Sequence, residues 1–263
     1  MIPPIALTIA GSDSGGGAGI QADLRTFAFH RVHGTCAITC VTAQNTLGVT
    51  RVDAIAPEGV TAQLEAVLAD LPPQALKTGM LLNAEIMEVV AQAIAPLTIP
   101  RIIDPVMVSR TGAVLIDQAA IAVLRDRLLP LATVLTPNRY EAQLLAGIEI
   151  QDAADLDRAA QIIGDLGPQA VLIKGGAATG VWHGVDWWWD GQQSQVLKTE
   201  AIATPHTHGS GCTLAAAIAA NAALGLDPLA ATQAAKTYVT EALRHSLAIG
   251  QGQGPLGHFY PLF

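Results

Sequence analysis

The segment Ile5-Ala-Leu-Thr-Ile-Ala10 runs into Gly11-Ser-Asp-Ser-Gly-Gly-Gly-Ala-Gly19, and an amphipathic segment then continues to Arg31. A short apolar run rich in β-branched residues is typical of a buried strand, and the glycines interrupt it before a helix begins. This strand–loop–helix unit predicts the start of an α/β domain, in which strands alternate with helices around a mostly parallel sheet.

The same alternation continues along the chain. Further strands are predicted at Thr35–Thr42, Ala75–Thr78, Arg101–Asp104, Thr133–Thr136 and Ala170–Lys174. Helices are predicted at Gly19–Arg31, Pro57–Asp70, Ala84–Ala95, Gln118–Leu128, Arg139–Ala146, Ala153–Asp165, Gly211–Leu224 and Pro228–Leu247. The segment Gly180–Thr199, with a turn at Asp190-Gly191, predicts a small antiparallel hairpin at the sheet edge. No linker or repeat interrupts residues 1–263, so we expect a single domain.

The composition narrows the class of protein and its partners. Of 263 residues, 51% are hydrophobic and 14% charged, which provides a large core and excludes a disordered chain. The net charge is −8 and the 14 Lys and Arg residues do not cluster, so neither nucleic acid nor a membrane is an expected partner. Three cysteines are an odd, sparse set that suits a reducing compartment. Met1-Ile-Pro-Pro4 lacks the basic residues of a signal peptide, so we expect a cytoplasmic protein.

Glycine or polar residues follow four of the predicted strands, at Gly11–Gly19, Asp104–Met107, Pro137–Glu141 and Gly175-Gly176. Because active sites of parallel sheets lie beyond the carboxyl ends of the strands, we expect these segments to share one cleft. Gly11–Gly19 does not fit the G-x-G-x-x-G pattern, and the chain has no G-x-x-x-x-G-K-S/T motif. These two absences disfavour a nicotinamide dehydrogenase and a P-loop enzyme.

The segment Thr207-His-Gly-Ser-Gly-Cys212, here called the 207–212 loop, precedes the Ala-rich run Leu214–Ala223. Glycines before a helix leave backbone N–H groups unpaired, and these groups together with the helix dipole hold anions. At such a position the pKa of the Cys212 thiol is expected to be lowered. We therefore predict a phosphate-handling site here, with a plain tight turn as the alternative.

Seven segments, taken together, resemble one known family. They are Ala10–Leu24, Thr42–Gly48, Lys77–Met80, Asp104–Met107, Thr136–Glu141, Lys174–Gly176 and Thr207–Cys212. In this order they resemble the hydroxymethylpyrimidine/phosphomethylpyrimidine kinases of thiamine biosynthesis, within the ribokinase-like superfamily, over essentially the whole chain. The resemblance implies a Rossmann-like three-layer fold, a homodimer, and two ATP-dependent phosphorylations. The first is on the hydroxymethyl oxygen of 4-amino-5-hydroxymethyl-2-methylpyrimidine, and the second is on the resulting monophosphate.

The resemblance also assigns a pyrimidine site. Gln44 is its main substrate-reading side chain, which is chemically apt because a carboxamide both donates and accepts hydrogen bonds. Gly11 lets the backbone approach a flat ring, Asp23 makes a further polar contact, and Met80 and Val106 enclose the ring. The alternative for Gln44 is a structural amide that caps a turn, and the other four are otherwise turn, helix-surface or core residues.

For the phosphate half, the resemblance assigns Mg²⁺ to Asp104 and Glu141, directly or through water. Lys174 neutralises charge on the transferring phosphoryl group, and Asn138 and Thr207 lie by the nucleotide. The alternatives are an Asx turn for Asp104, a solvated first-turn acid for Glu141, and a solvated strand cap for Lys174.

The expected mechanism places the γ-phosphoryl group on the N–H groups of Gly209, Ser210, Gly211 and Cys212 while the substrate hydroxyl attacks in line. Related sugar kinases carry an Asp, taken as the catalytic base, at the position of Cys212. A Cys212 thiolate is therefore the expected base here. On that basis Cys212→Ala lowers turnover by about 10²- to 10⁴-fold with little effect on ATP affinity.

Three rival functions remain, and the nearest is a pyridoxal kinase of the same subgroup. Pyridoxal kinases with a two-cysteine mechanism carry Cys in the segment where this chain has Ser109, which cannot form a hemithioacetal. A non-catalytic pyrimidine-binding module and a sugar kinase are the others, and Cys212 disfavours the sugar kinase. The run Trp187-Trp188-Trp189 predicts packing on both faces of an edge strand, or a subunit contact.

Overall fold

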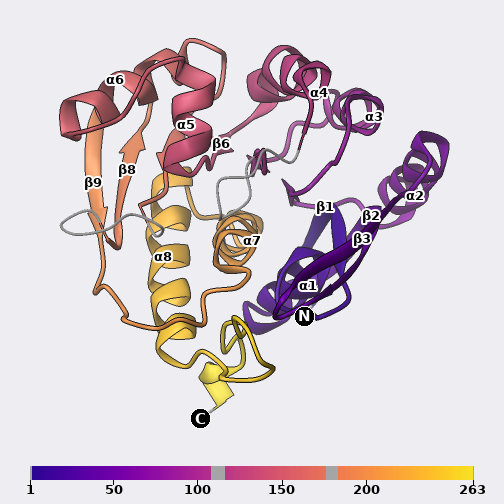
Figure 1. The fold of residues 1–263 in the computed structure, drawn as a ribbon. Coiled ribbons are helices and arrows are strands. Elements are labelled where there is room, and N and C mark those ends of the chain that lie inside the picture. The colour runs from indigo at the N-terminus through magenta and orange to yellow at the C-terminus, as the bar shows by residue number, and fades with distance from the viewer. Residues whose placement is uncertain (1, 108–115, 176–182, 263) are drawn as a thin grey trace.

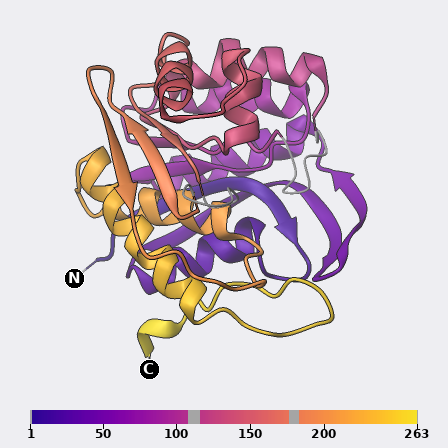
Figure 2. The same ribbon diagram turned by 60° about the vertical axis from the view of Figure 1, so that its left-hand side comes forward.

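The computed structural model describes residues 2–107, 116–175 and 183–262. Within these ranges nine strands form one sheet, with helices on both of its faces (Figures 1 and 2). The strands are β1 Ile5–Asp13, β2 His33–Asn45, β3 Gly48–Ala54, β4 Ala75–Thr78, β5 Arg101–Ile103, β6 Val134–Leu135, β7 Val171–Ile173, β8 Val185–Trp189 and β9 Ser194–Lys198. The helices are α1 Gly19–Phe29, α2 Pro57–Asp70, α3 Ala84–Ile94, α4 Gln118–Val123, α5 Arg139–Ala146, α6 Ala153–Gly164, α7 Ser210–Ala223 and α8 Pro228–Arg244.

The strand order is β3-β2-β1-β4-β5-β6-β7-β8-β9. In this order, the neighbouring strands β2, β1, β4, β5, β6 and β7 pair in parallel. The edge strand β3 pairs antiparallel with β2, and at the other edge β8 pairs antiparallel with both β7 and β9. These findings confirm the predicted α/β class, the mostly parallel sheet and the antiparallel edge hairpin. The first three residues of the predicted hairpin segment, 180–182, lie outside the described residues.

The sequence did not predict β3, which adds an antiparallel strand at the opposite edge of the sheet. All seven of its residues are exposed, so the strand has no buried face and no alternation of apolar and polar residues. A strand held only by backbone pairing to β2 leaves no periodic signal in the sequence.

The sheet separates two hydrophobic cores. One lies under α2 to α6, and the other lies under α1, α7 and α8. In α7 every residue from Thr213 to Ala223 is buried, because the helix is surrounded by the sheet, α1 and α8. Its alanines allow this close approach. The sheet and its two helical layers are therefore the predicted three-layer arrangement.

The tryptophan run in β8 faces both cores. Trp188 is buried in the core of α7 and α8, while Trp187 and Trp189 pack against the other core. Strand alternation thus explains the run as packing on both faces of the sheet. No helix of the described residues is both long enough and apolar enough to cross a membrane.

Several predicted helices end earlier than expected, and the differences are largest at α4 and α8. The segment predicted as Gln118–Leu128 is helical only to Val123 and continues as a π-helical turn, η1 Leu124–Leu128, and then a 3₁₀ turn, η2 Leu129–Leu131. Helix α8 ends at Arg244. A further 3₁₀ turn, η4 Tyr260–Leu262, lies near the C-terminus.

Candidate active site

The N-terminus of α7 lies at the ends of several strands. A Cβ placed on Gly211 would be 3.5 Å from Lys174 Nζ and 3.9 Å from Asp104 Oδ2. Lys174 follows β7 and Asp104 follows β5, and Glu141, beyond β6, hydrogen-bonds the backbone of Met107. The predicted convergence of separate strand ends on the 207–212 loop is therefore present.

Only part of the predicted anion-binding loop has free amides. The Ser210 amide donates to the Thr207 carbonyl at 3.2 Å, so the prediction that it binds phosphate conflicts with an existing hydrogen bond. The amides of Gly209, Gly211 and Cys212 have no acceptor within the described part of the chain. These three groups form the part of the loop that can receive an anion.

A second glycine-rich loop, Gly11–Gly19, packs against the 207–212 loop. Gly209 has φ +82°, and a Cβ on it would lie 1.8 Å from the carbonyl oxygen of Gly17. Gly209 therefore meets two requirements at once, a left-handed backbone and close contact with the Gly11–Gly19 segment.

This contact gives a testable expectation for Gly209→Ala. The substitution should displace both loops, lower kcat/KM at least about tenfold, and destabilise the fold by more than the ~1 kcal/mol of an unfavourable φ alone. Gly225→Ala is the matched control, because Gly225 has φ +94° with no atom within 4 Å of an added Cβ. Thermal unfolding and initial rates should separate the two variants; equal losses would show that the Gly17 contact has no role.

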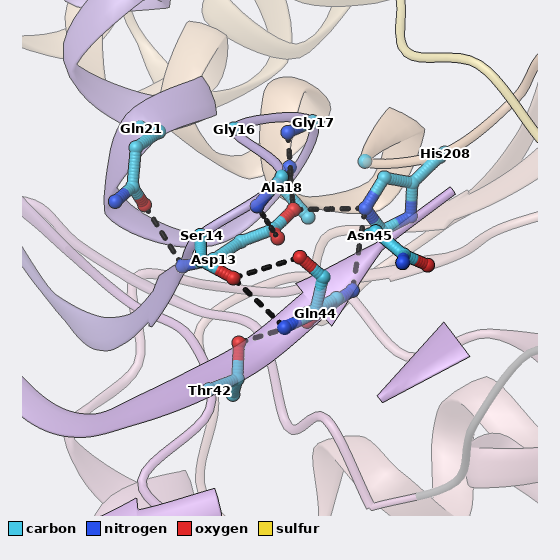
Figure 3. Close-up of polar contacts among 12 residues, drawn as sticks. Asp13, Ser14, Gly16, Gly17, Ala18, Gln21, Thr42, Gln44, Asn45 and His208 are labelled. Carbon is cyan, nitrogen blue, oxygen red and sulfur yellow. Dashed lines mark hydrogen bonds and ion pairs between the residues drawn. The ribbon is translucent and has the colours of Figure 1, made fainter. Parts of the chain in front are cut away.

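Sequence reasoning missed Asp13, which organises the first glycine-rich loop (Figure 3). Its carboxylate accepts backbone hydrogen bonds from Gly15, Gly17 and Ala18 at 2.8 to 3.0 Å. The amides of this loop are therefore engaged by the protein itself. An Asp two residues before a run of glycines was the available signal, since such acids commonly bind the amides that follow them.

His208, also missed, links the two loops. Its Nε2 lies 2.9 Å from Asp13 Oδ2 and 3.3 Å from Gln44 Nε2. Gln44 Oε1 lies 3.1 Å from the hydroxyl of Thr42, and the side chain is partly buried. Gln44, the predicted substrate-reading residue, is thus next to the 207–212 loop. In the described residues its amide contacts the side chains of Thr42 and His208 and no backbone group of a turn, and its role in reading the substrate stays a prediction.

Asp23 lies in a fully buried ion pair. Its Oδ2 accepts hydrogen bonds from Lys77 Nζ at 2.8 Å and from Thr8 at 2.6 Å, and both charged side chains are 0% exposed. Its Oδ1 is buried with no hydrogen-bond partner among the described residues. Because this atom is itself buried, the predicted contact of Asp23 with substrate stays a prediction. The lysine in the apolar strand Ala75–Thr78 was a sequence signal that a buried counter-charge was needed.

The expected lowering of the Cys212 pKa is wrong. Burial raises the pKa of this thiol, and although Lys77 opposes burial, Asp23 and Asp104 add to the increase. The free thiol is therefore the dominant form at neutral pH. The helix dipole does not outweigh the loss of solvation around the sulfur.

Asp104 and Lys174, both predicted for the phosphate half of the site, form an ion pair. Asp104 Oδ1 accepts a hydrogen bond from Lys174 Nζ at 2.9 Å, and the two side chains are 4% and 14% exposed. Burial alone would lower the pKa of Lys174, but Asp104 and Glu141 raise it above its usual value. Lys174 is thus a charged, largely enclosed group rather than a solvated cap.

Glu141 is buried and holds two backbone segments. Its Oε2 accepts from the Asn138 amide at 2.8 Å and its Oε1 from the Met107 amide at 3.0 Å. Burial raises its pKa, although Lys174 acts against this increase. Asn138 completes the capping box by accepting from the Glu141 amide with Oδ1, which leaves its Nδ2 for a ligand. Glu141 is therefore no solvated acid, and it fixes the turn after Asp104.

The apolar residues predicted to enclose the ring follow neighbouring strands. A Cβ on Gly11 would lie 2.6 Å from Cys40 Sγ and 3.3 Å from Met80 Cε, so only glycine fits there. Val106 follows β5 with φ +40°, which is strained for a β-branched residue. Met80 and Val106 are both partly buried. Ser109 and Gly176 lie outside the described residues.

Comparison with known proteins identifies the family of this chain. Residues 13–257 match the family described as phosphomethylpyrimidine kinase. A hydroxymethylpyrimidine/phosphomethylpyrimidine kinase of Synechococcus elongatus is 91% identical over 263 residues, which is 100% of both chains. Among solved structures, Bacillus subtilis pyridoxal kinase in an ADP complex superposes with a TM-score of 0.92 at 39% identity over 100% of both chains. Phosphomethylpyrimidine kinase of Clostridium difficile gives a TM-score of 0.82 at 40% identity over 91% of this chain and 99% of that one.

These matches extend across all the strand ends that build the site. The family match alone spans residues from Asp13 to Gly257, and the shared fold is ribokinase-like. The chain therefore belongs to the phosphomethylpyrimidine kinase family and is an enzyme, a kinase of thiamine biosynthesis.

Proposed function

We propose that residues 1–263 act as one kinase domain that phosphorylates 4-amino-5-hydroxymethyl-2-methylpyrimidine and then its monophosphate, with ATP as donor. The observation that most supports this proposal is that Lys174 and Asp104 lie beside Gly211, at the start of α7, where the amides of Gly211 and Cys212 have no acceptor among the described residues. This arrangement suits phosphoryl transfer, which depends mainly on positioning and on stabilising negative charge. ATP is further supported by the ADP complex of the related Bacillus subtilis pyridoxal kinase.

In the proposed reaction, the substrate oxygen forms a bond to the γ-phosphorus while the bond from that phosphorus to the ADP oxygen breaks. The amides of Gly209, Gly211 and Cys212 hold the phosphoryl oxygens, and Lys174 offsets their charge. Gln44 binds the pyrimidine, Met80 and Val106 lie against its ring with Gly11 beneath, and Asn138 and Thr207 contact the nucleotide. The proton of the substrate hydroxyl passes to the Cys212 thiolate.

Mg²⁺ fits at Asp104. Its Oδ2 has no hydrogen-bond donor among the described residues, whereas each Glu141 oxygen already accepts a backbone N–H and retains one lone pair. Direct coordination by Asp104 and a water-mediated contact by Glu141 suit an ion that keeps several waters. When bound there, the ion would supply positive charge that offsets the charge of the phosphate groups.

The raised pKa of Cys212 gives a pH prediction for its role as proton acceptor. Because only the thiolate accepts a proton, kcat should increase with pH from about 6.5 to above 8.5, the ordinary pKa of a thiol. Cys212→Ala should lower kcat by about 10²-fold or more and abolish this pH dependence, with ATP affinity nearly unchanged. A flat profile for the parent enzyme would restrict Cys212 to its backbone amide.

A homodimer and a cytoplasmic location are also part of the proposal. The hairpin of β2 and β3 exposes Val41, Leu47, Val49 and Val52, at 43%, 68%, 51% and 43% of their surfaces. An exposed edge strand with apolar side chains is suited to pairing with a second copy. Light scattering of the parent protein and of Leu47→Glu tests the dimer, which the added charge should dissociate.

The proposed cytoplasmic location is supported by the cysteines. Cys36, Cys40 and Cys212 are free thiols, as is usual in a reducing compartment.

Pyridoxal phosphorylation is the second candidate, because full-length superposition on a pyridoxal kinase at a TM-score of 0.92 leaves room for a similar heteroaromatic alcohol. The test measures ADP release with the pyrimidine alcohol, its monophosphate, pyridoxal and ribose. The first two should give the highest kcat/KM. No turnover of either, with turnover of pyridoxal, would overturn the proposed function.

A further inference from the structure

The Gln44 carboxamide lies between two side chains that each have a second partner (Figure 3). Thr42 Oγ1 is 3.1 Å from Gln44 Oε1, and His208 Nε2 is 3.3 Å from Gln44 Nε2. The two ends of a carboxamide are nearly equal in size, and a half-turn about its Cγ–Cδ bond exchanges them. The hydrogen atoms available on Thr42 and His208 therefore decide which end faces which neighbour.

On the Thr42 side, the hydroxyl has a single hydrogen and two oxygen neighbours. The carbonyl oxygen of Ser12, 2.9 Å away, only accepts hydrogen bonds and therefore takes that hydrogen. Thr42 Oγ1 then has only lone pairs to offer to Gln44. The amide end that stabilises this contact is the N–H donor, Nε2.

On the His208 side, the second neighbour is the Asp13 carboxylate at 2.9 Å. Burial acts to raise the pKa of Asp13, but hydrogen bonds from His208, Ala18 and Gly15 outweigh burial and keep it below its usual value. An ionised carboxylate only accepts, so His208 Nε2 carries a hydrogen. That N–H can donate to an acceptor on Gln44 as well, but Nε2 cannot accept a hydrogen bond from a donor. The end of the Gln44 amide that faces His208 must therefore be the acceptor, Oε1.

Both sides select the same orientation of the amide. We propose that Asp13 and His208, with Thr42 opposite, are positioning residues that hold Gln44 with Oε1 toward His208 and Nε2 toward Thr42, and so set which aromatic ring it recognises. Each amide atom then keeps one hydrogen-bonding position for a ligand, an acceptor on the His208 side and a donor on the Thr42 side. This inference rests on the proposed contact between Gln44 and the substrate.

The fixed order of acceptor and donor matches an aminopyrimidine. Its exocyclic amine donates to Oε1 while the adjacent ring nitrogen accepts from Nε2, which gives a two-point contact. The reversed amide would place two N–H groups face to face and two lone pairs face to face. Pyridoxine, whose ring carries no amino group, gains little from this order. The chain of contacts from Asp13 through His208 to Gln44, here called the relay, therefore favours aminopyrimidines over other hydroxymethyl heterocycles.

The test uses His208→Phe, which keeps a planar ring against Gly17, whose Cα is close to the His208 ring. Losing one oriented hydrogen bond should raise KM for the pyrimidine alcohol about 3- to 10-fold, with kcat within about twofold. KM for pyridoxine should stay unchanged. His208→Gln, which restores an N–H donor, should recover most of the loss. Equal increases in KM for both alcohols, or a fall in kcat alone, would overturn the proposal.

A double-mutant cycle shows whether His208 acts through Gln44. In a Gln44→Met background, His208→Phe should have no further effect on KM, because the amide that it orients is gone. The combination of His208→Phe with Thr42→Val should cost more than the product of the single effects, since only then is the amide free to rotate. His30→Phe is the matched control: His30 is a partly buried histidine that contacts the Thr26 carbonyl and packs edge-on against Tyr238.

A measurement independent of turnover separates this inference from the proposed function. Long-range ¹H–¹⁵N correlation of the unliganded protein should show a hydrogen on His208 Nε2, and Asp13→Asn should alter that signal. A hydrogen on Nδ1 alone would refute the relay even if the kinase activity is as proposed. Conversely, an enzyme inactive on the pyrimidine alcohol would refute the proposed function while leaving the tautomer result intact.

Discussion

Lys174→Met is expected to lower kcat by about 10²- to 10³-fold, the effect typical of removing one group that stabilises charge in the transition state. Lys174 Nζ lies beside Gly211, whose amide is free to hold a phosphoryl oxygen, and is 2.9 Å from Asp104 Oδ1. Because Asp104 and Glu141 raise its pKa, it stays charged throughout the working pH range. Its loss removes a positive charge from the place where negative charge develops.

The control for Lys174→Met is Lys198→Met, at an exposed position at the end of β9 that contacts neither loop. Lys174→Arg should retain part of the activity, since the charge remains but the geometry at Asp104 changes. Single-turnover rates with circular dichroism as a check of folding separate catalysis from stability. A Lys174→Met enzyme with kcat within threefold of the parent would contradict the assigned role.

Lys77→Met should destabilise the protein by about 3–5 kcal/mol, because it leaves Asp23 as an uncompensated buried charge. Both members of this pair are 0% exposed, and among the described residues Asp23 Oδ2 accepts hydrogen bonds from Lys77 and Thr8 alone. For a chain of this size the loss corresponds to a Tm decrease of roughly 6–20 °C. Differential scanning calorimetry measures it directly.

The pH dependence of that loss has a defined sign. Burial already raises the pKa of Asp23, and Lys77 is the main group acting against this increase. Without Lys77, folded Asp23 binds a proton more tightly than unfolded Asp23, so the variant loses stability as pH increases from about 4 toward its folded pKa. The deficit should therefore be larger at pH 8 than at pH 5.

Two further variants test the cause. Arg51→Met removes one member of an exposed pair, with side chains 73% and 55% exposed, and should change stability by less than about 1 kcal/mol. The double variant Lys77→Met/Asp23→Asn should recover part of the loss, because no buried charge remains. A double variant less stable than Lys77→Met alone would show that cavity formation, and not charge, dominates.

Local signals were sufficient to predict most of the fold. The short strand Ala75–Thr78 was predicted with its observed bounds, although Lys77 and Thr78 are polar. Helix α2 begins at Pro57 and helix α5 is capped by Asn138, and both were located by those residues. Strand β3 lacked any such signal because all of its residues are exposed.

The sequence predicted which strand ends lie together, but not the electrostatics of the residues there. Spacing and resemblance identified Gln44, Asp104 and Lys174, and the structure places Asp104, Lys174 and the 207–212 loop together. The pKa of Cys212 could not be predicted, because it depends on burial and on charges from residues far away in sequence. For the same reason the Asp13–His208 contact, across 195 residues, was not foreseen.

The most direct test of the central claim is a crystal structure with the pyrimidine alcohol and a non-hydrolysable ATP analogue. The terminal phosphate should lie within hydrogen-bond distance of the Gly211 and Cys212 amides and of Lys174 Nζ, with the ring against Gln44 and its hydroxymethyl oxygen facing the phosphorus. A pyrimidine bound elsewhere, or a terminal phosphate held away from those amides, would contradict the account.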